Sequence, residues 1–346
     1  MLYCGLDVAV KSSYLYIVDA RGRKVASGEV ETSPVALIRR LRPYIRRRLA
    51  VALEAGSQSA WIHDLLVELG ASVTVVPPAK LRLIAESRRK TDKIDAKLLA
   101  ELLRVDGLPE PVHVPDRGTR SLRQLLVARQ QLVRMRTALI NTLRGLLRQE
   151  GVNLPAGELT SLAGWRRLRD DPALDECQKM IVETLFEVFE VLMRLVRRYD
   201  QQLDEWARRD PRVARLRTIP KVGRIASLTL LAAVGDVGRF GSSRKLIGYT
   251  GLAPSVRSSG ERTIYGRITR QGRSELRAVW VQIAHLVAAD TRRETEPLRR
   301  WFVRLARRRG RKTAIVALAR KLLTIAFRLL SDETVYDPAR VGVRAV

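Results

Sequence analysis

Over residues 1–80, apolar runs of strand length alternate with amphipathic runs of helix length. The apolar runs end at Gly, Pro or Ser, which is typical of β-strands. Ser33 followed by Pro34 indicates a helix start, because serine caps free N–H groups and proline suits the first helical position. Strands are expected at 2–10, 13–22, 23–32, 49–57 and 71–78, and helices at 33–48 and 60–70. This β-β-β-α-β-α-β order predicts a mixed sheet flanked by helices, an α/β domain.

Four acidic residues interrupt this pattern. Asp7 lies inside the first strand in "YCGLDVAV" and Glu54 ends a later strand in "VALEAGS", where a charge is costly unless it is paired or bound to a metal. Asp92 and Asp95 lie three residues apart on one helix face, in "RKTDKIDAKLLAELLR" (89–104). One interpretation is a helix start, with Asp92 as the cap and Asp95 in the first turn. The other interpretation is a metal site.

From about 117 to 206 the strand pattern is replaced by helical periodicity. Apolar residues recur every seven positions, with a second column between them, as in a coiled coil. The two columns are Leu125, Leu132, Leu139 and Leu146, and Ala128, Met135 and Thr142. After a break at 151–159, a second helical segment is expected at about 172–206. We interpret the two segments as a spacer that also serves as a dimerisation arm.

Pro211 precedes a third, mainly α region at about 212–335. Its segment "IPKVG" places Pro220 and Gly223 in a tight turn between helices, which predicts a helix-hairpin-helix-like element that presents N–H groups to a DNA phosphate. An ordinary turn between two helices is the alternative. The following segment, 238–285, is interpreted as a phosphate-binding loop that leads into an apolar helix.

The formal net charge of +28 indicates a polyanionic partner, because self-repulsion of this size destabilises a compact fold. The excess is mostly arginine, in clusters such as 39–48 and 304–321, and the arginine fork suits phosphate better than lysine does. The helices lack aromatic anchors for a membrane surface. Nucleic acid is therefore the expected partner, and no membrane contact is expected.

The few cysteines and histidines argue against a zinc site. Cys4 and Cys177 are far apart and belong to no CxxC pattern, and the histidines are His63, His113 and His285. No signal peptide and no apolar run of membrane-spanning length is found. A cytoplasmic protein is expected.

The order of the acids, Asp on the first strand, Glu on the fourth and Asp-x-x-Asp on a later helix, resembles the RNase H-like (RuvC-like) nuclease fold. In that fold such acids gather at one edge of the sheet. Carboxylate oxygens suit Mg²⁺, with Mn²⁺ as a substitute. Two ions about 3.5–4 Å apart would stabilise the attacking and leaving oxygens of a phosphoryl transfer.

Six segments carry a closer resemblance, and they follow one another across nearly the whole chain. They are "GLDVA", "ALEAGS", "KTDKIDAKLLAEL", "IPKVG", "RFGSSRKLIGYTGLAP" and "SSGERTIYGRITRQGRSELR". In this combination the sequence resembles the DEDD transposases of the IS110 insertion-sequence family, and with them the Piv-type DNA invertases.

The resemblance implies a recombinase that cuts and rejoins DNA through a covalent phosphoserine. The Mg²⁺ ligands it implies are Asp7, Glu54, Asp92 and Asp95. The implied nucleophile is Ser259, or Ser258 if the register shifts by one. It further implies guidance by an element-encoded bridge RNA that pairs with donor and target DNA. It also implies a prokaryotic, nucleoid-associated location.

The residues expected to contact nucleic acid lie in the turn and in the segment after it. They are Lys221, Gly223, Arg224, Arg257, Gly260, Arg267, Arg270 and Arg273. Two departures from the family pattern concern these contacts. Family members often have an acidic residue a little after the first motif, where this chain reads "KSSYLYIVD". The second departure is "RQGRSELR", which stands in place of the usual Lys-x-Gly-Asn.

Three domains are expected: a metal-binding RuvC-like domain (1–112), a helical linker and dimerisation region (113–206), and a transposase domain with the serine (207–346). A homodimer that assembles to a tetramer would hold two DNA duplexes. Two other functions stay open. A RuvC-type endonuclease would need the acids and not Ser259, and a nucleic-acid-binding protein without catalysis would need neither.

Overall fold

The computed structural model describes residues 1–82, 91–259, 262–293 and 295–342. The chain divides into two compact units, 1–115 and 116–346. The helical segment after residue 116 belongs to the second unit, together with the C-terminal region.

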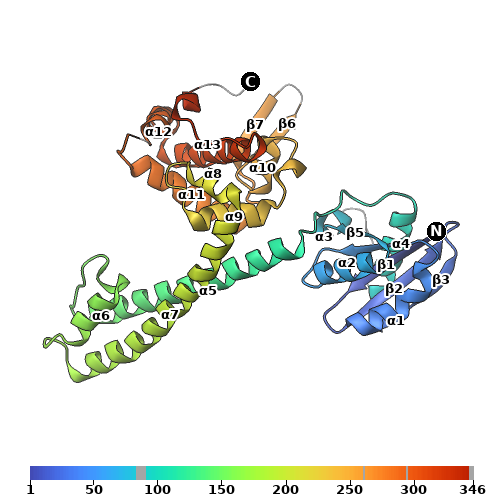
Figure 1. Cartoon of the computed structure of the whole chain (residues 1–346), viewed down its shortest axis with the longest axis horizontal. Coiled ribbons are helices and arrows are strands. Elements are labelled where there is room, and N and C mark those ends of the chain that lie inside the picture. Colours follow the sequence, from blue (N-terminus) through green and yellow to red (C-terminus); the bar gives the residue numbers. More distant parts are fainter. Residues whose placement is uncertain (83–90, 260–261, 294, 343–346) are drawn as a thin grey trace. The chain divides into compact units, whose positions relative to one another are not determined.

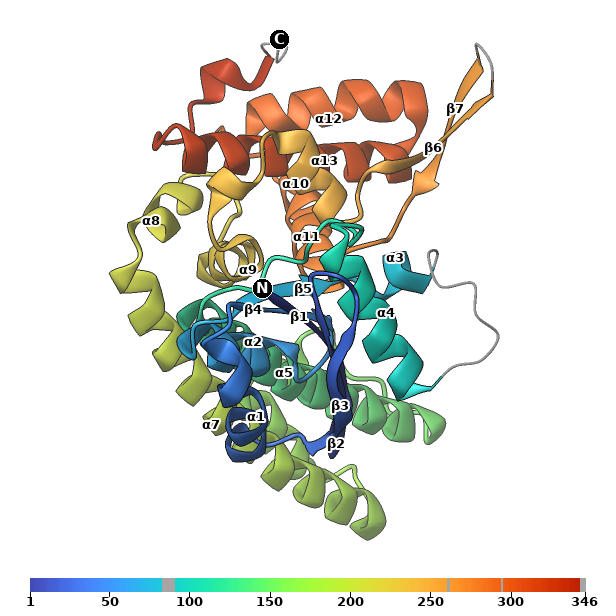
Figure 2. The ribbon, with the colours of Figure 1, turned by 90° about the vertical axis from the view of Figure 1, so that its right-hand side faces the viewer.

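The first unit is a five-stranded mixed sheet with helices on both faces (Figures 1 and 2). The strands are β1 (Leu2–Val8), β2 (Ser12–Asp19), β3 (Lys24–Glu31), β4 (Leu49–Glu54) and β5 (Ser72–Val76). The helices are α1 (Pro34–Ile45), α2 (Ser59–Glu68), α3 (Pro78–Arg82) and α4 (Asp92–Arg104). The spatial order is β3-β2-β1-β4-β5, in which β1, β4 and β5 are parallel and the β1–β2–β3 pairs antiparallel. This confirms the predicted mixed sheet.

Alternation along the strands divides the sheet into two faces. Leu2, Cys4 and Leu6 of β1 join a core with the buried leucines of α1 and α2. On the other face, Tyr16 of β2 packs with Ala96 of α4. Figure 2 shows α1 and α2 on one side of the sheet and α4 on the other.

Helix α4 approaches β1 most closely at Gly5. A Cβ atom at this position would overlap the carbonyl oxygen of Ala96 and would lie 2.6 Å from the amide nitrogen of Ala100. Only glycine permits this approach, because any side chain would push the helix away from the strand. Gly5 therefore sets the distance between α4 and the sheet.

The helix starts confirm one predicted cap and correct another. Ser33 caps α1 by accepting a hydrogen bond from the Ala36 amide at 3.3 Å, as predicted. Helix α4 is capped by Thr91 and not by Asp92, because Thr91 has the extended backbone of a cap and its hydroxyl accepts from the Ile94 amide at 3.3 Å. Asp92 is the first helical residue.

The second unit is almost entirely helical (Figure 1). Its α-helices are α5 (Arg117–Gln149), α6 (Leu162–Arg169), α7 (Glu176–Arg209), α8 (Pro211–Arg217), α9 (Arg224–Val234), α10 (Ser243–Tyr249), α11 (Ser274–Ala289), α12 (Glu296–Arg309) and α13 (Arg311–Ser331). Short 3₁₀ turns lie at η1 (Glu158–Thr160), η2 (Val237–Arg239) and η3 (Pro338–Gly342), and β6 (Pro254–Ser259) pairs with β7 (Arg262–Ile268). A large apolar core around Trp280 holds α9, α11 and α13 together.

The long helices α5 and α7 pack against each other and, with α6, enclose a second core around Trp165. The predicted heptad stripe is only part of their contact. Leu146 and Met135 are 39% and 48% exposed. The second column of the contact consists instead of Leu122, Arg129, Arg136 and Leu143. Two arginines fit there because Arg129 pairs with Asp200 of α7 at 2.8 Å and Arg136 contacts the sulfur of Met193 at 3.5 Å.

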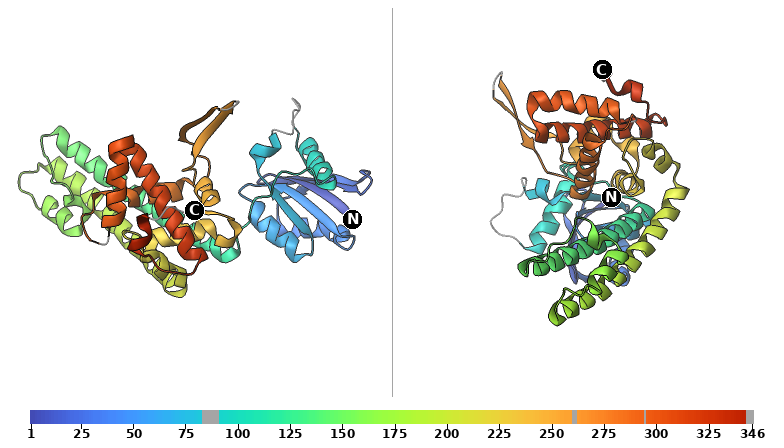
Figure 3. Two further views of the ribbon diagram at one scale, coloured as in Figure 1. Left: turned by 90° about the horizontal axis from the view of Figure 1, so that it is seen from above. Right: turned by 90° about the vertical axis from the view of Figure 1, so that its left-hand side faces the viewer.

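The segment expected to form a loop at 238–285 contains a β-hairpin, which was not predicted. Strands β6 and β7 pair antiparallel, with Ser258 opposite Thr263 and Ser259 opposite Arg262. The hairpin stands out from the helices around it (Figure 3). Val256, Ile264 and Tyr265 are exposed on it, so buried apolar residues do not mark most of the length of these two strands.

The turn at "IPKVG" joins α8 to α9, as predicted. Lys221 has a positive φ of 67°, and Gly223 is the N-cap residue of α9. The ammonium group of Lys221 lies 3.0 Å from the carboxylate of Asp290, the residue that ends α11. Burial alone would raise the pKa of Asp290, but hydrogen bonds from Lys221 and Arg292 outweigh it and lower this pKa to about 2.

Replacing Gly5 with alanine should detach α4 from the sheet. We expect Gly5→Ala to lower the free energy of unfolding by about 3 kcal/mol, since the overlap is with backbone that cannot rotate away. Urea unfolding followed by circular dichroism measures this. The control is Gly56→Ala, where nothing lies within 4 Å of the added Cβ. Equal midpoints for the two variants would show that the close approach is not needed.

The Lys221–Asp290 ion pair should make stability depend on acid pH. Because the folded-state pKa of Asp290 is lowered, its contribution is present at neutral pH and is lost as pH falls from about 4, its ordinary pKa, toward about 2. We expect Asp290→Asn to melt below wild type at neutral pH, with a gap that closes over this interval. Melting temperatures across the pH series measure the gap, and Asp332→Asn, at an exposed aspartate, is the control. A pH-independent gap for Asp290→Asn would contradict the expectation.

Candidate active site

Strand register brings Asp7 and Glu54 side by side. In the parallel pair of β1 and β4, Leu6 lies opposite Leu53, and each acid is the next residue along its strand. Since Leu6 and Leu53 point into the core of α1 and α2, alternation directs both acids toward the opposite face. Both side chains are partly exposed. The carboxyl ends of two adjacent parallel strands therefore present two carboxylates on the face that α4 covers.

The direction of α4 adds Asp92 and Asp95 to the same edge. Ala96 and Ala100 lie over Gly5, and the guanidinium group of Arg104, at the end of α4, lies 3.4 Å from where a Cβ of Gly22 would be. Gly22 belongs to the β2–β3 turn, beside the amino end of β1. Helix α4 therefore runs antiparallel to β1, and its first turn lies at the carboxyl end of β1, where Asp7 is.

The four acids thus share one edge and one face of the sheet, although they do not form a closed cage. Among the described residues, no three His, Cys, Asp or Glu side chains come close enough together to hold a metal ion. The donor set itself suits Mg²⁺, which takes few carboxylates and keeps several waters and phosphate oxygens. Asp92 and Asp95 are also stabilised by the helix dipole, because both lie in the first turn of α4.

Ser259 lies in the second unit, at the end of β6, and Ser258 precedes it on the same strand. Gly260, which the sequence places after Ser259, lies outside the described residues. The hairpin arginines Arg257 and Arg267 are exposed, as is Arg270 in the segment after β7. The structure therefore puts both serines on a basic, exposed hairpin.

Three of the other predicted nucleic-acid contacts, Lys221, Arg224 and Arg273, bond to protein groups. Lys221 pairs with Asp290, and Arg224 forms ion pairs with Asp204 and, at 2.8 Å, with Asp200. Arg273 donates from Nε to the hydroxyl of Tyr249 at 3.3 Å. Gly223 has open space around its Cα at the start of α9.

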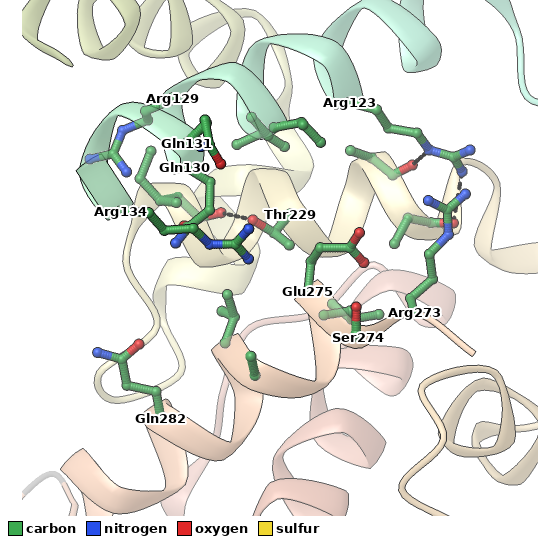
Figure 4. Close-up of a pocket in the computed structure, with 18 residues that line it drawn as sticks. Arg123, Arg129, Gln130, Gln131, Arg134, Thr229, Arg273, Ser274, Glu275 and Gln282 are labelled. Carbon is green, nitrogen blue, oxygen red and sulfur yellow. Dashed lines mark hydrogen bonds between the residues drawn. The ribbon is translucent and has the colours of Figure 1, made fainter. Parts of the chain in front are cut away.

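A pocket of about 370 Å³ lies between α5, α9 and α11 (Figure 4). Its lining contains four arginines, Arg123, Arg129, Arg134 and Arg273, over a floor that includes Ile225 and Leu276. Of these arginines the sequence analysis named only Arg273. Arg123 lies in the helical segment predicted from about 117 to 206, where neither charge nor periodicity distinguishes it from its neighbours. Only the packing of α5 on α9 could identify it.

None of the described helices combines the length and apolar character needed to cross a membrane.

Comparison with known proteins identifies the family. Residues 4–151 match a family model described as a transposase, and residues 213–312 match the model of the IS116/IS110/IS902 transposase family. A probable family 20 transposase of Pseudomonas aeruginosa is 29% identical over 96% of this chain and 98% of its own length. The transposase for insertion sequence element IS1111A of Coxiella burnetii is 27% identical, over 96% of this chain and 90% of its own.

A putative transposase of Sinorhizobium fredii, y4qE, is 30% identical over 82% of this chain and 70% of its own length. The first family model spans the first unit and continues through α5 of the second, and it covers the acids Asp7, Glu54, Asp92 and Asp95. The other model lies within the second unit and covers the serine hairpin. The chain therefore belongs to the IS116/IS110/IS902 family of transposases, which are enzymes that act on DNA.

Proposed function

We propose that this transposase cuts and rejoins DNA through a covalent phosphoserine formed on Ser259, with Mg²⁺ held by Asp7, Glu54, Asp92 and Asp95. The observation that carries the proposal is the convergence of strand register and helix direction at one sheet edge. Carboxylates grouped at a sheet edge are a suitable platform for a phosphoryl transfer, since they bind the cation that neutralises phosphate charge.

The reaction exchanges one phosphoester for another. The Oγ atom of Ser259 forms a bond to phosphorus, and the bond from phosphorus to one deoxyribose oxygen breaks, which leaves that oxygen as a free hydroxyl. The serine proton passes to a base, for which the chain offers carboxylates. Attack by a deoxyribose hydroxyl of another DNA end then reverses these steps and restores the serine. No external energy source is required, because the ester bond is conserved.

The metal would supply charge neutralisation and a lowered pKa for the attacking hydroxyl. The chain's own part is to orient these groups. Gly5 and Ala96 hold α4 against β1, which keeps the first turn of α4 beside the ends of β1 and β4. Serine is a weak nucleophile at neutral pH and needs such activation.

A guide RNA is part of the proposal. A net charge of +28 suits extensive contact with nucleic-acid backbone, and the exposed arginines on the hairpin suit duplex backbone without reading its sequence. Base pairing by a bridge RNA would then select the donor and target sites, as in other guided effectors. A homodimer that pairs into a tetramer would bring together the DNA ends for exchange.

Covalent attachment tests the nucleophile. From cells that carry the native locus and a tagged protein, we expect denaturing purification to recover DNA attached to wild type. Attachment should be lost in Ser259→Ala and reduced at least about a hundredfold in Asp7→Asn, because activation of the hydroxyl is lost. Quantitative PCR of the attached DNA measures both effects.

Ser258→Ala is the matched control, since it removes the adjacent hydroxyl on the same strand. If Ser258→Ala loses the adduct and Ser259→Ala keeps it, the nucleophile is Ser258. Cleaved DNA without attachment, equal in wild type and both serine variants, would instead identify a hydrolytic RuvC-type nuclease.

Dependence on RNA tests the guide. We expect the native complex, purified gently from the same cells, to contain one abundant RNA from the element's flank. Digestion with RNase before DNA is added should abolish cleavage, since site selection would be lost. Addition of the transcribed flank after RNase inhibition should restore it. Full cleavage after RNase treatment would contradict guidance by RNA.

A further inference from the structure

Three arginines from different helices and turns lie close to Ala233, which lines the pocket between α5, α9 and α11; Arg123 and Arg273 line the pocket with it. Arg123 comes from α5, Arg239 from η2, and Arg273 immediately precedes α11. Two of them, Arg123 and Arg239, donate to the same acceptor, the carbonyl oxygen of Ala233. It accepts from Arg123 Nη2 at 3.1 Å and from Arg239 Nη2 at 3.5 Å. We call these three residues the arginine cluster.

The hydroxyl of Tyr249 connects the cluster. It donates to the same Ala233 carbonyl at 3.3 Å and accepts from Arg273 Nε at 3.3 Å. The guanidinium of Arg239 stacks over the Tyr249 ring, 4.8 Å from its centroid, and over the Phe240 ring at 4.2 Å. Figure 4 shows the guanidinium groups of Arg123 and Arg273 beside each other at this end of the pocket.

Within the described part of the chain, none of the three guanidinium groups forms an ion pair with Asp or Glu, although Glu275 also lines the pocket. Other arginines of the second unit do form such pairs, among them Arg129, Arg212 and Arg224. The carboxyl end of α9 supplies only about half an elementary negative charge against three positive ones. Asp116, whose charge acts on Arg123, is already engaged by Thr119.

The titration of the surrounding groups reflects this imbalance. Burial lowers the pKa of Arg123, and the charge of Arg273 lowers it further. Burial alone would raise the pKa of Tyr249, yet this pKa is lowered because the hydrogen bond and charge of Arg273, with the charges of the other two arginines, outweigh burial. The local field therefore favours a negative charge.

We propose that the arginine cluster is a binding site for one phosphodiester group of a nucleic-acid strand, with the Arg273 guanidinium as the principal contact. Arg273 donates only through Nε among the described contacts, so its terminal nitrogens are free to form the two-pronged contact that phosphate accepts. That the ligand is a nucleic acid follows from the proposed function, on which this site rests. The site adds a contact, through Arg123 and Arg239, that the sequence motifs did not indicate.

A structural role is the competing explanation. Arg123 and Arg239 donate to the carbonyls at the end of α9, as Arg123 Nε does to Ala232 at 2.5 Å and Arg239 Nε to Val234 at 2.8 Å. Two arginines account for these caps. Among the described contacts the Arg273 side chain caps no carbonyl and bonds only to the Tyr249 hydroxyl, so capping of α9 does not account for its place beside two like charges.

Measuring both the melting temperature and the nucleic-acid affinity of Arg273 variants separates the structural explanation from the binding site. Because Arg273 is repelled by its neighbours, we expect Arg273→Gln to melt at or above the wild-type temperature without ligand. Inorganic phosphate should raise the melting temperature of wild type and not of the variant. The matched control is Arg212→Gln, which breaks a paired arginine, 2.7 Å from Asp210, and should melt below wild type.

Nucleic-acid binding is then measured over a range of salt with a mixed-sequence DNA duplex and, separately, a mixed-sequence RNA hairpin. Arg273→Gln should weaken binding about tenfold, as for loss of one charge-assisted hydrogen-bonded contact, and should reduce the salt slope by about one. Arg273→Lys, which keeps the charge and loses the fork, should restore the slope and only part of the affinity. An effect on one probe alone identifies whether DNA or RNA supplies the phosphate.

Two results would overturn the site. One is a lower melting temperature for Arg273→Gln with unchanged affinity, which is the behaviour of a structural cap. The other is unchanged affinity and slope for both probes in a stable variant. Failure of the proposed recombination chemistry can be told apart from failure of this site. If the chemistry is wrong, no covalent adduct is found, but phosphate still raises the melting temperature of wild type.

Discussion

The close approach of α4 to β1 at Gly5 is the contact on which the acid-bearing edge depends. The helix rests on the strand through its backbone at Ala96 and Ala100, and the Cβ atom of Leu99 lies beside the same point. This contact fixes the distance of α4 from the sheet and the position of its first turn along β1. Asp92 and Asp95 reach the edge occupied by Asp7 and Glu54 only because no side chain intervenes. A glycine in the first strand motif is therefore as necessary to the candidate site as the acids themselves.

The second unit handles its charge in two distinct ways. Some arginines that lie between packed helices are accompanied by an aspartate, as Arg129 and Arg224 are by Asp200. Pairing of this kind lets charged side chains occupy a helix contact without an unbalanced charge. On the hairpin and in the arginine cluster no such partners are found among the described residues. The contrast separates arginines whose charge an aspartate balances from arginines without an acidic partner among the described residues.

Much of the architecture could be predicted from the sequence because it depends on short-range patterns. The strand and helix order of the first unit, the cap at Ser33 and the turn at "IPKVG" all follow from neighbouring residues. The errors arose where local patterns were ambiguous. Thr91 and Asp92 are both good caps, and only backbone geometry selects Thr91. The exposed hairpin of β6 and β7 lacks the buried alternation that marks core strands.

For this protein, the sequence by itself determined the family, the mixed sheet, the set of acids and the need for a polyanion, because residue types and their order suffice for each. It could not determine that Lys221 and Arg224 are held by aspartates, or that Arg129 and Arg136 face α7. Nor could it bring Arg123, Arg239 and Arg273 around Tyr249. Those relations join residues up to 150 positions apart, as Arg123 and Arg273 are, and they arise only when helices pack. Charge balance is a property of three-dimensional neighbours, so only the tertiary structure decided which of the described arginines have an acidic partner and which do not.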